Sequence, residues 1–207
     1  MAEGYFITFE GIDGIGKTTH ITQLRRYLVD NDHSVFIYRE PGGTKFGEGL
    51  RAVLKDSTVS RTSIAELLAF NAARHVGVEQ IVRPALENGQ VVLADRFDDS
   101  TVVYQGICGG LDLEVVNSVI NIATNGLKPN LTFLIDADPS IAIRGGGDHF
   151  EDRGKGYQEE LRKGFLDLAK DEPERFRIIP YRKDEFEEMQ EEIRGIVAEL
   201  IGLQKIV

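Results

Sequence analysis

The sequence predicts an α/β protein of the P-loop NTPase type, with a doubly wound, five-stranded parallel sheet, surrounding helices and a short lid. Two observations carry this prediction. Short apolar runs alternate along the chain with stretches whose apolar residues recur at helical spacing, which is typical of strand–helix–strand units. The first apolar run and the first helical stretch flank a phosphate-loop motif at residues 11–18. Right-handed connections then place the strands in one parallel sheet.

The phosphate loop follows the expected strand at 5–9 and precedes an amphipathic helix, which is the context that this motif requires. Its glycines permit the backbone angles that turn successive N–H groups toward phosphate oxygens, and the helix N-terminus adds donors and a favourable dipole. Lys17 is expected to reach the β- and γ-phosphates of a nucleotide, and the Thr18 hydroxyl to bind magnesium.

Composition limits the class of protein. A chain of 207 residues without a linker or low-complexity run is expected to form one domain, residues 1–207. It has no apolar run that could span a bilayer and no leader after Met1, so we expect a soluble, cytoplasmic protein without a membrane partner. The single cysteine, Cys108, excludes an intrachain disulfide. A net charge of −10 argues against nucleic-acid binding, so locally placed arginines must hold anionic ligands.

Two further strands are expected to end in charged residues. The run 34–38 ends at Arg39, before a loop that contains Pro and Gly, and the run 91–94 is followed by Asp95 and Arg96. In an open parallel sheet ligands bind beyond the carboxyl ends of strands, so these three residues should lie beside the phosphate loop. Asp95 is a candidate magnesium ligand and the two arginines are candidate phosphate contacts. A solvated Arg39 and a purely structural pair of Asp95 with Arg96 are the alternatives.

A long helical pattern over residues 62–88 places Phe70 and Arg74 one turn apart on one face. Together they can hold a planar base, one by stacking and the other by hydrogen bonding. Apolar residues at helical spacing are usually core, so spacing alone favours a core Phe70 beside a surface Arg74. The remaining elements are expected to be helices near 50–54, 98–104, 112–122, 161–169 and 186–200, and strands at 131–136 and 176–180.

Residues 144–155 are expected to form the lid. The segment contains three successive glycines together with Arg144, His149 and Arg153. Phosphoryl transfer requires that water is excluded and that charge on the transferred group is neutralised, and a basic closing lid provides both. A loop that is merely flexible is the alternative.

With these residues in view, the chain resembles the thymidylate kinases, which are P-loop nucleoside monophosphate kinases that phosphorylate dTMP to dTDP for dTTP synthesis. The resemblance covers nearly the whole chain and rests on four motifs in order, at residues 9–19, 39–44, 95–97 and 104–106. It implies ATP as the phosphoryl donor, Mg²⁺ as the metal, small-molecule substrates and a homodimer. The residues that it implies for ATP binding are Gly11, Ile12, Asp13, Gly14, Ile15, Gly16, Lys17, Thr18 and Thr19.

The resemblance implies direct, in-line transfer. Arg39 and Arg96 match arginines that hold the dTMP phosphate, and Asp13 matches a residue that faces the sugar 3′-hydroxyl and that phosphate. The acceptor is already an anionic phosphate oxygen, so no strong base is needed. Catalysis then consists of positioning and of charge neutralisation by Lys17, magnesium, Arg96 and the lid.

The resemblance also implies a thymine pocket. Phe70 matches the aromatic residue that stacks on the base, and Arg74 matches an arginine that donates to a thymine carbonyl, which reverses the interpretation from spacing alone. Thr101 matches a residue that contacts the base. Tyr104 matches one whose ring crowds the 2′ carbon and so favours deoxyribose, and Gln105 lines the same pocket.

Two departures from the family pattern affect the lid. Some members carry a basic residue in the phosphate loop, where this chain has Gly-Ile at 14–15, so the chain resembles members whose lid supplies the catalytic arginine. The usual Asp-Arg step of that lid is Asp-His at 148–149 in this chain. Arg144 and Arg153 are therefore both candidates for the catalytic arginine. A neutral histidine stabilises charge less well, which predicts lower or pH-dependent activity.

Three alternatives stay open at this stage. The chain can be a kinase for another nucleoside monophosphate or for a nucleoside. It can also be a catalytically weak, nucleotide-binding regulatory protein that keeps the pocket but not the chemistry. The third alternative is a P-loop GTPase switch, against which the lack of an Asn-Lys-x-Asp base-reading signature argues.

Overall fold

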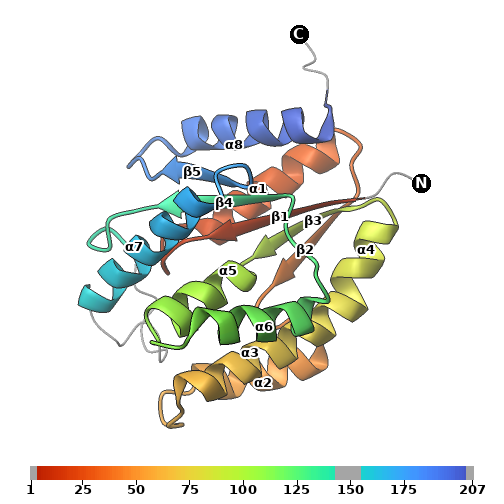
Figure 1. Cartoon of the computed structure of the whole chain (residues 1–207). Helices are drawn as coiled ribbons and strands as arrows, with labels where there is room; N and C mark the ends of the chain where they lie inside the picture. Colours follow the sequence, from red (N-terminus) through yellow and green to blue (C-terminus); the bar gives the residue numbers. More distant parts are fainter. Residues whose placement is uncertain (1–3, 143–154, 204–207) are drawn as a thin grey trace.

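A parallel five-stranded sheet with helices on both faces forms the centre of the computed structural model, which describes residues 4–142 and 155–203 (Figure 1). The strands are β1 (Tyr5–Glu10), β2 (Val35–Arg39), β3 (Val91–Asp95), β4 (Leu131–Asp136) and β5 (Phe176–Pro180). Their order in the sheet is β2-β3-β1-β4-β5, and every neighbouring pair is parallel. The predicted fold class is confirmed.

The helices separate into two layers. They are α1 (Lys17–Asp30), α2 (Lys45–Lys55), α3 (Ser63–Gly77), α4 (Arg83–Glu87), α5 (Asp98–Thr101), α6 (Leu113–Thr124), α7 (Lys155–Asp171) and α8 (Phe186–Ile201), with π-helical segments η1 (Val78–Val82) and η2 (Val102–Ile107). α1 and α8 lie together on one face of the sheet, and the other helices lie on the opposite face (Figure 1). No helix among the described residues is long and apolar enough to cross a bilayer.

The central strand, β1, is buried on both faces. Ile7 and Phe9 belong to the same core cluster as Leu24 of α1. Phe6 lies in a second cluster, where its ring meets that of Phe97 edge to face at 4.8 Å between centroids. Burial on both faces explains why this strand is a continuous apolar run in the sequence rather than an alternating one.

The carboxyl ends of three strands lie at one level of the sheet. Asp95, the last residue of β3, is in register with Arg39 at the end of β2 and with Phe9 near the end of β1. The phosphate loop leaves β1 directly after this level. The register therefore brings Arg39, Asp95 and Arg96 to the edge where the phosphate loop lies, as strand-end reasoning predicts.

The long helical pattern predicted at 62–88 is found as one continuous helical run from α3 through η1 to α4. Thr62 caps its start, since the side chain accepts a hydrogen bond from the N–H of Ala65. Pro84 near its end has no N–H to donate and would crowd the preceding turn of an α-helix. The wider π-helical turn at Val78–Val82 precedes this proline and accommodates it.

Gly77, the last residue of α3, gives a test of the packing between the helical run and the sheet. A Cβ at this position would overlap the hydroxyl of Tyr38 and lie 2.7 Å from Cζ of the same ring. Tyr38 is 1% exposed, so its ring cannot move aside into solvent. We expect Gly77→Ala to lower the free energy of unfolding by about 1–3 kcal/mol in urea denaturation, as overpacking does.

Gly195 in α8 is the matched control, because it is exposed and a Cβ there would have no atom within 4 Å. Gly195→Ala should leave stability unchanged or raise it by about 0.4–1 kcal/mol. Equal effects of the two substitutions would contradict the packing described for Gly77.

Candidate active site

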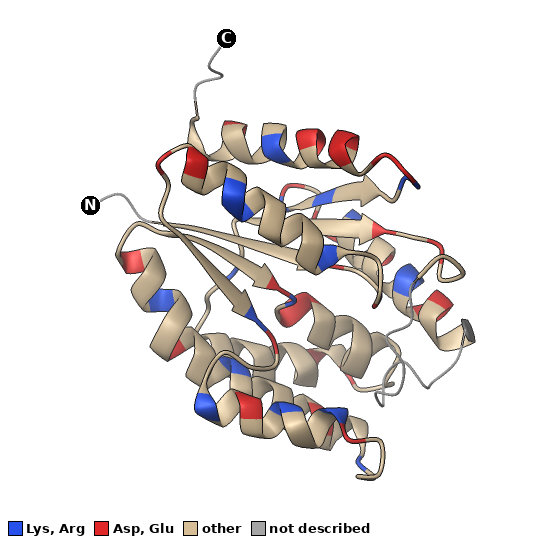
Figure 2. Ribbon diagram, turned by 180° about the vertical axis from the view of Figure 1, so that it is seen from behind, with Lys and Arg blue, Asp and Glu red and all other residues tan. Residues whose placement is uncertain are grey.

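A cavity of about 490 Å³ lies at the carboxyl ends of the strands. Charged residues stand at or directly after the ends of β2 and β3 (Figure 2). The lining of the cavity comes from the phosphate loop, the loop after β2, helices α2 and α3, and the segment after β3. Of the expected site residues that the structure describes, all line it except Gly11 and Ile12, which are buried. Arg144 and Arg153 of the expected lid lie outside the described residues, as does His149.

The phosphate loop holds Lys17 in place. The ammonium Nζ donates hydrogen bonds to the carbonyl oxygens of Gly11, at 3.1 Å, and Ile12, at 2.7 Å. Burial lowers the pKa of Lys17 to about 8, and the nearby Arg96 acts in the same direction. Gly11 is required at its position, because its φ is 129° and a Cβ would lie 2.5 Å from the carbonyl oxygen of Ile135. Lys17 is thus a buried cation inside a loop shaped for phosphate.

Thr18 and Asp95 lie side by side. The Thr18 hydroxyl at the start of α1 donates to Asp95 Oδ2 at the end of β3, with 2.6 Å between the oxygens. Both groups are hard oxygen donors, which is the ligand type that Mg²⁺ prefers. Because Mg²⁺ usually keeps several waters and binds nucleotide phosphates as well, two protein oxygens beside a phosphate loop fit such an ion.

Arg96 connects the phosphate loop to the segment after β3. Its Nη2 donates to Asp13 Oδ1 at 2.7 Å and to the Tyr104 hydroxyl at 3.2 Å, and Tyr104 donates to Asp13 Oδ2 at 3.3 Å. Burial works against the Asp13 charge, but Arg96 and Lys17 hold the pKa of Asp13 well below its usual range. Arg96 has a φ of 70°, which is uncommon for a residue other than glycine, so its surroundings fix a strained backbone here.

Sequence reasoning did not single out Glu10, whose hydrogen bonds hold the strained segment that begins at Arg96. Its carboxylate is fully buried and accepts hydrogen bonds from the Phe97 N–H at 2.8 Å and the Ser100 hydroxyl at 2.6 Å. Arg96 Nη1 lies 3.7 Å from Glu10 Oε2. An acidic residue at the end of an otherwise apolar strand, directly before the phosphate loop, was the available signal.

The arginines at the two ends of the cavity differ in how far they are exposed to solvent. Arg39 is half exposed, and its guanidinium lies 3.7 Å from Glu48. Arg74 is 1% exposed and forms an ion pair with Glu40, 2.7 Å from Nη2 to Oε2. Phe70 is half-buried and lines the cavity. Phe70 also packs against the main core cluster. The surface position that spacing alone favours for Arg74 is wrong, because Glu40 from a distant loop pairs with the guanidinium and allows it to be buried.

Two basic residues of α2 also line the cavity. They are Arg51, whose Nη1 donates to the Pro41 carbonyl at 2.9 Å, and Lys55. In the sequence this helix was expected only as a short amphipathic element. The loop after β2 brings this helix to the cavity, and the spacing of apolar residues in the sequence does not specify the path of that loop.

The burial of Glu10 has a consequence for pH dependence. Burial raises the pKa of Glu10 to about 8, from about 4.5 in the unfolded chain, although Arg96 opposes the shift. The folded carboxyl therefore binds its proton more tightly than the unfolded one, so the free energy of unfolding should fall as pH rises from about 4.5 to about 8. The slope is at most about 1.4 kcal/mol per pH unit.

Glu10→Gln keeps the shape of the side chain but cannot titrate, so this part of the slope should disappear in the variant. Urea denaturation at about pH 5 and about pH 8 measures it. Burial also raises the pKa values of Glu40 and Asp99, and the difference between wild type and variant removes their contribution. An unchanged slope in the variant would contradict the assignment to Glu10.

The comparisons with known proteins agree with this geometry. A family model described as Thymidylate kinase matches residues 9–193. The thymidylate kinase of Symbiobacterium thermophilum is 42% identical over 201 residues, which cover 95% of this chain and 94% of the relative. That of Deinococcus radiodurans is 40% identical over 204 residues, which cover 96% and 98%. A crystal structure of thymidylate kinase from Ehrlichia chaffeensis superimposes with a TM-score of 0.79 at 34% identity, covering 94% of this chain and 98% of that one. The chain therefore belongs to the thymidylate kinase family and is a nucleoside monophosphate kinase that phosphorylates dTMP.

Proposed function

We propose that this chain transfers the γ-phosphoryl group of ATP to dTMP by direct in-line attack, with Mg²⁺, and that the cavity at the strand ends is where it does so. The main observation in support is that one cavity is lined both by the phosphate loop and by Phe70 with Arg74. A donor nucleotide and a base can therefore occupy the same space. The catalytically weak regulatory protein is not favoured, and neither is a kinase for another nucleoside monophosphate.

The phosphates are held by this chain's cations. Lys17 neutralises charge on the transferred group, and Arg39 and Arg96 hold the acceptor phosphate for in-line attack. Asp13 keeps Arg96 in position through the 2.7 Å ion pair and faces the sugar. Because a phosphate monoester oxygen is already anionic, the mechanism needs no general base. Arg144 or Arg153 of the lid would add a further cation, and the choice between them stays a prediction.

Thr18 and Asp95 are the residues that would hold Mg²⁺, directly or through water. When bound, this ion neutralises charge on the phosphate oxygens of the donor. The protein supplies two oxygen atoms 2.6 Å apart at the end of the phosphate loop. The base is bound by stacking on Phe70 and by hydrogen bonds with Arg74, Thr101 and Gln105, while the Tyr104 ring crowds the 2′ carbon of the sugar.

A homodimer is proposed on the outer faces of α3 and α6, which lie side by side (Figure 1). Large apolar side chains are exposed on both helices: Ile64 and Leu68 on α3, and Val115 and Ile122 on α6, of which Ile122 is 75% exposed. Exposed apolar residues on two neighbouring helices favour an interface, and a two-fold axis would pair the same helices of two copies. A single domain over 1–207, a lid at 144–155 and a cytoplasmic location stay predictions from the sequence.

The substrate assignment is tested by coupled ADP release with ATP and magnesium, comparing dTMP, dUMP, dCMP, dGMP and UMP as acceptors. We expect strong preference for dTMP, because the pocket combines a stacking ring, directed hydrogen bonds and a side chain against the 2′ position. Acceptor-independent ADP release, or none from a folded protein that binds ATP, would contradict the proposed transfer.

The role of Lys17 is tested by Lys17→Met. Turnover should fall by about 100-fold or more, the scale on which one preorganised charge-stabilising donor acts. Affinity for dTMP, measured by calorimetry, should stay close to wild type because Lys17 is not among the residues proposed to hold dTMP. Lys183→Met, which removes an exposed lysine far from the phosphate loop in sequence, is the control. Parallel loss of turnover and dTMP binding would indicate a misfolded loop instead.

A further inference from the structure

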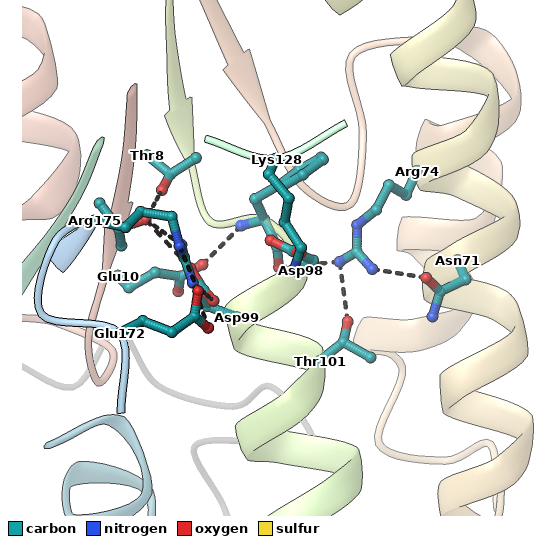
Figure 3. Close-up of polar contacts among 12 residues, drawn as sticks. Thr8, Glu10, Asn71, Arg74, Asp98, Asp99, Thr101, Lys128, Glu172 and Arg175 are labelled. Carbon is teal, nitrogen blue, oxygen red and sulfur yellow. Dashed lines mark hydrogen bonds and ion pairs between the residues drawn. The ribbon is translucent and has the colours of Figure 1, made fainter. Parts of the chain in front are cut away.

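The guanidinium of Arg74 is fixed by its surroundings on every side but one. Nε donates to Glu40 Oε1 and Oε2 at 3.1 and 2.9 Å, and Nη2 donates to Glu40 Oε2 at 2.7 Å, to the Phe97 carbonyl at 3.0 Å and to Thr101 Oγ1 at 2.9 Å. Nη1 donates to Asn71 Oδ1 at 2.8 Å (Figure 3). A guanidinium has five N–H groups. One N–H, on Nη1, therefore has no acceptor within the part of the chain that the structure describes.

Glu40 makes this arrangement possible. Its side chain is 4% exposed and cancels the charge of the buried Arg74. The Tyr38 hydroxyl, 3.3 Å from Oε1, gives the carboxylate a further donor. A bidentate carboxylate holds the plane of a guanidinium as well as its charge. The remaining N–H of Arg74 thus belongs to a neutral, oriented pair that lines the cavity.

Gln105 is oriented in the same way by a second buried carboxylate. Its Nε2 donates to Glu66 Oε2 at 3.1 Å, and both side chains are 1% exposed. Arg61 Nε lies 3.4 Å from the other oxygen of Glu66, so the charge of that carboxylate is compensated. A carboxylate only accepts hydrogen bonds, so the amide nitrogen of Gln105 must face it. The amide oxygen is left as the acceptor at the other end of the amide.

The two oriented groups are neighbours through Thr101. Thr101 accepts a hydrogen bond from Arg74 and precedes Gln105 by four residues, about one helical turn. All three line the cavity, as does Phe70, whereas Glu40 reaches it from the loop after β2. The cavity wall therefore carries one free donor, from Arg74, and one acceptor, from Gln105, on either side of Thr101.

We propose that Glu40 and Glu66 are positioning residues that set the direction of hydrogen bonding in the base pocket and so determine which base is accepted. A donor beside an acceptor fits a base with a carbonyl oxygen next to a ring N–H, as in thymine and uracil. Cytosine has an amino group and an unprotonated ring nitrogen at those places. The Arg74 N–H would then face the amino group, and the Gln105 amide oxygen would face the ring nitrogen, so neither could form a hydrogen bond. The inference rests on the proposed base-binding role of Arg74 and Gln105.

Buried, directed groups discriminate strongly because a mismatched base leaves their donors and acceptors unpaired. Charge alone would not discriminate in this way, since both bases are neutral. The direction of each hydrogen bond is what differs between them, and in this chain two carboxylates fix that direction.

The experiment measures kcat/KM for dTMP and for dCMP in wild type and in Glu66→Gln. The amide introduced at position 66 can donate to the Gln105 oxygen, which lets the Gln105 amide reverse and present a donor to cytosine. We expect the ratio of dTMP to dCMP to fall by about 10- to 100-fold, with the KM for ATP unchanged. Glu40→Gln should lower the same ratio by raising the KM for dTMP.

Two control variants separate an effect on the direction of hydrogen bonds in the base pocket from an effect on folding stability. Tyr38→Phe removes one hydrogen bond to Glu40 but keeps the pair with Arg74, and Glu172→Gln removes a carboxylate that pairs with Arg175 away from the cavity. Both should keep the wild-type ratio. The double variant Glu66→Gln with Gln105→Glu puts an acceptor-only group at position 105 and should restore the preference for dTMP, which a merely structural role of Glu66 would not do.

An unchanged ratio in folded Glu66→Gln, or a double variant without restored preference, would overturn the proposal. The double variant decides alone if Glu66→Gln does not fold. A rise in the KM for ATP equal to that for dTMP would show a structural role only, which also overturns it. If wild type itself does not prefer dTMP over dCMP, the base-binding role of Arg74 and Gln105 fails rather than the role of the two carboxylates.

Discussion

Pairing between guanidinium groups and carboxylates at the carboxyl edge of the sheet, buried at Arg74 and half-buried at Arg96, is the interaction on which the site depends. Arg96 is held by Asp13, and Arg74 by Glu40, with 2.7 Å between the closest nitrogen and oxygen in each pair. A guanidinium taken out of water without a partner would be strongly destabilising, so Arg74 can stay buried only where a carboxylate meets it. The parallel register supplies those places, because it brings the ends of three strands to one level. A chain with a net charge of −10 can in this way bind anionic substrates.

The same pairing produces two electrostatic environments in one cavity. At the phosphate loop, Lys17, Arg39 and Arg96 line the cavity, and in the proposed function they hold the phosphate oxygens. At the other end, Glu40 compensates the charge of the buried Arg74. We propose that this wall binds the base and selects it by the direction of its hydrogen bonds. One half of the cavity thus suits phosphoryl transfer and the other suits recognition of a neutral base.

Much of this could be predicted from the sequence, and the reasons are physical. β1 and β3 are apolar runs because both of their faces are buried, and the phosphate loop is specified by glycines at positive φ values that other residues rarely adopt. The rule that ligands bind at strand ends placed Asp95 and Arg96 correctly. The buried carboxylates were missed because their partners lie 34 residues away for Glu40 and 87 for Glu10. The spacing of residues within one helix or strand cannot predict pairs that are so far apart in the sequence. For the same reason, spacing alone placed Arg74 on the surface.

The central claim, that carboxylates hold the arginines in place before substrate binds, is tested most directly by a crystal structure of the chain with dTMP bound. The account predicts that Arg74 keeps its hydrogen bonds to Glu40 and that Arg96 keeps its ion pair with Asp13. It also predicts that the Arg74 Nη1 N–H left without an acceptor donates to a carbonyl oxygen of the base. Arginines that leave their carboxylates and adopt new rotamers around dTMP would contradict it.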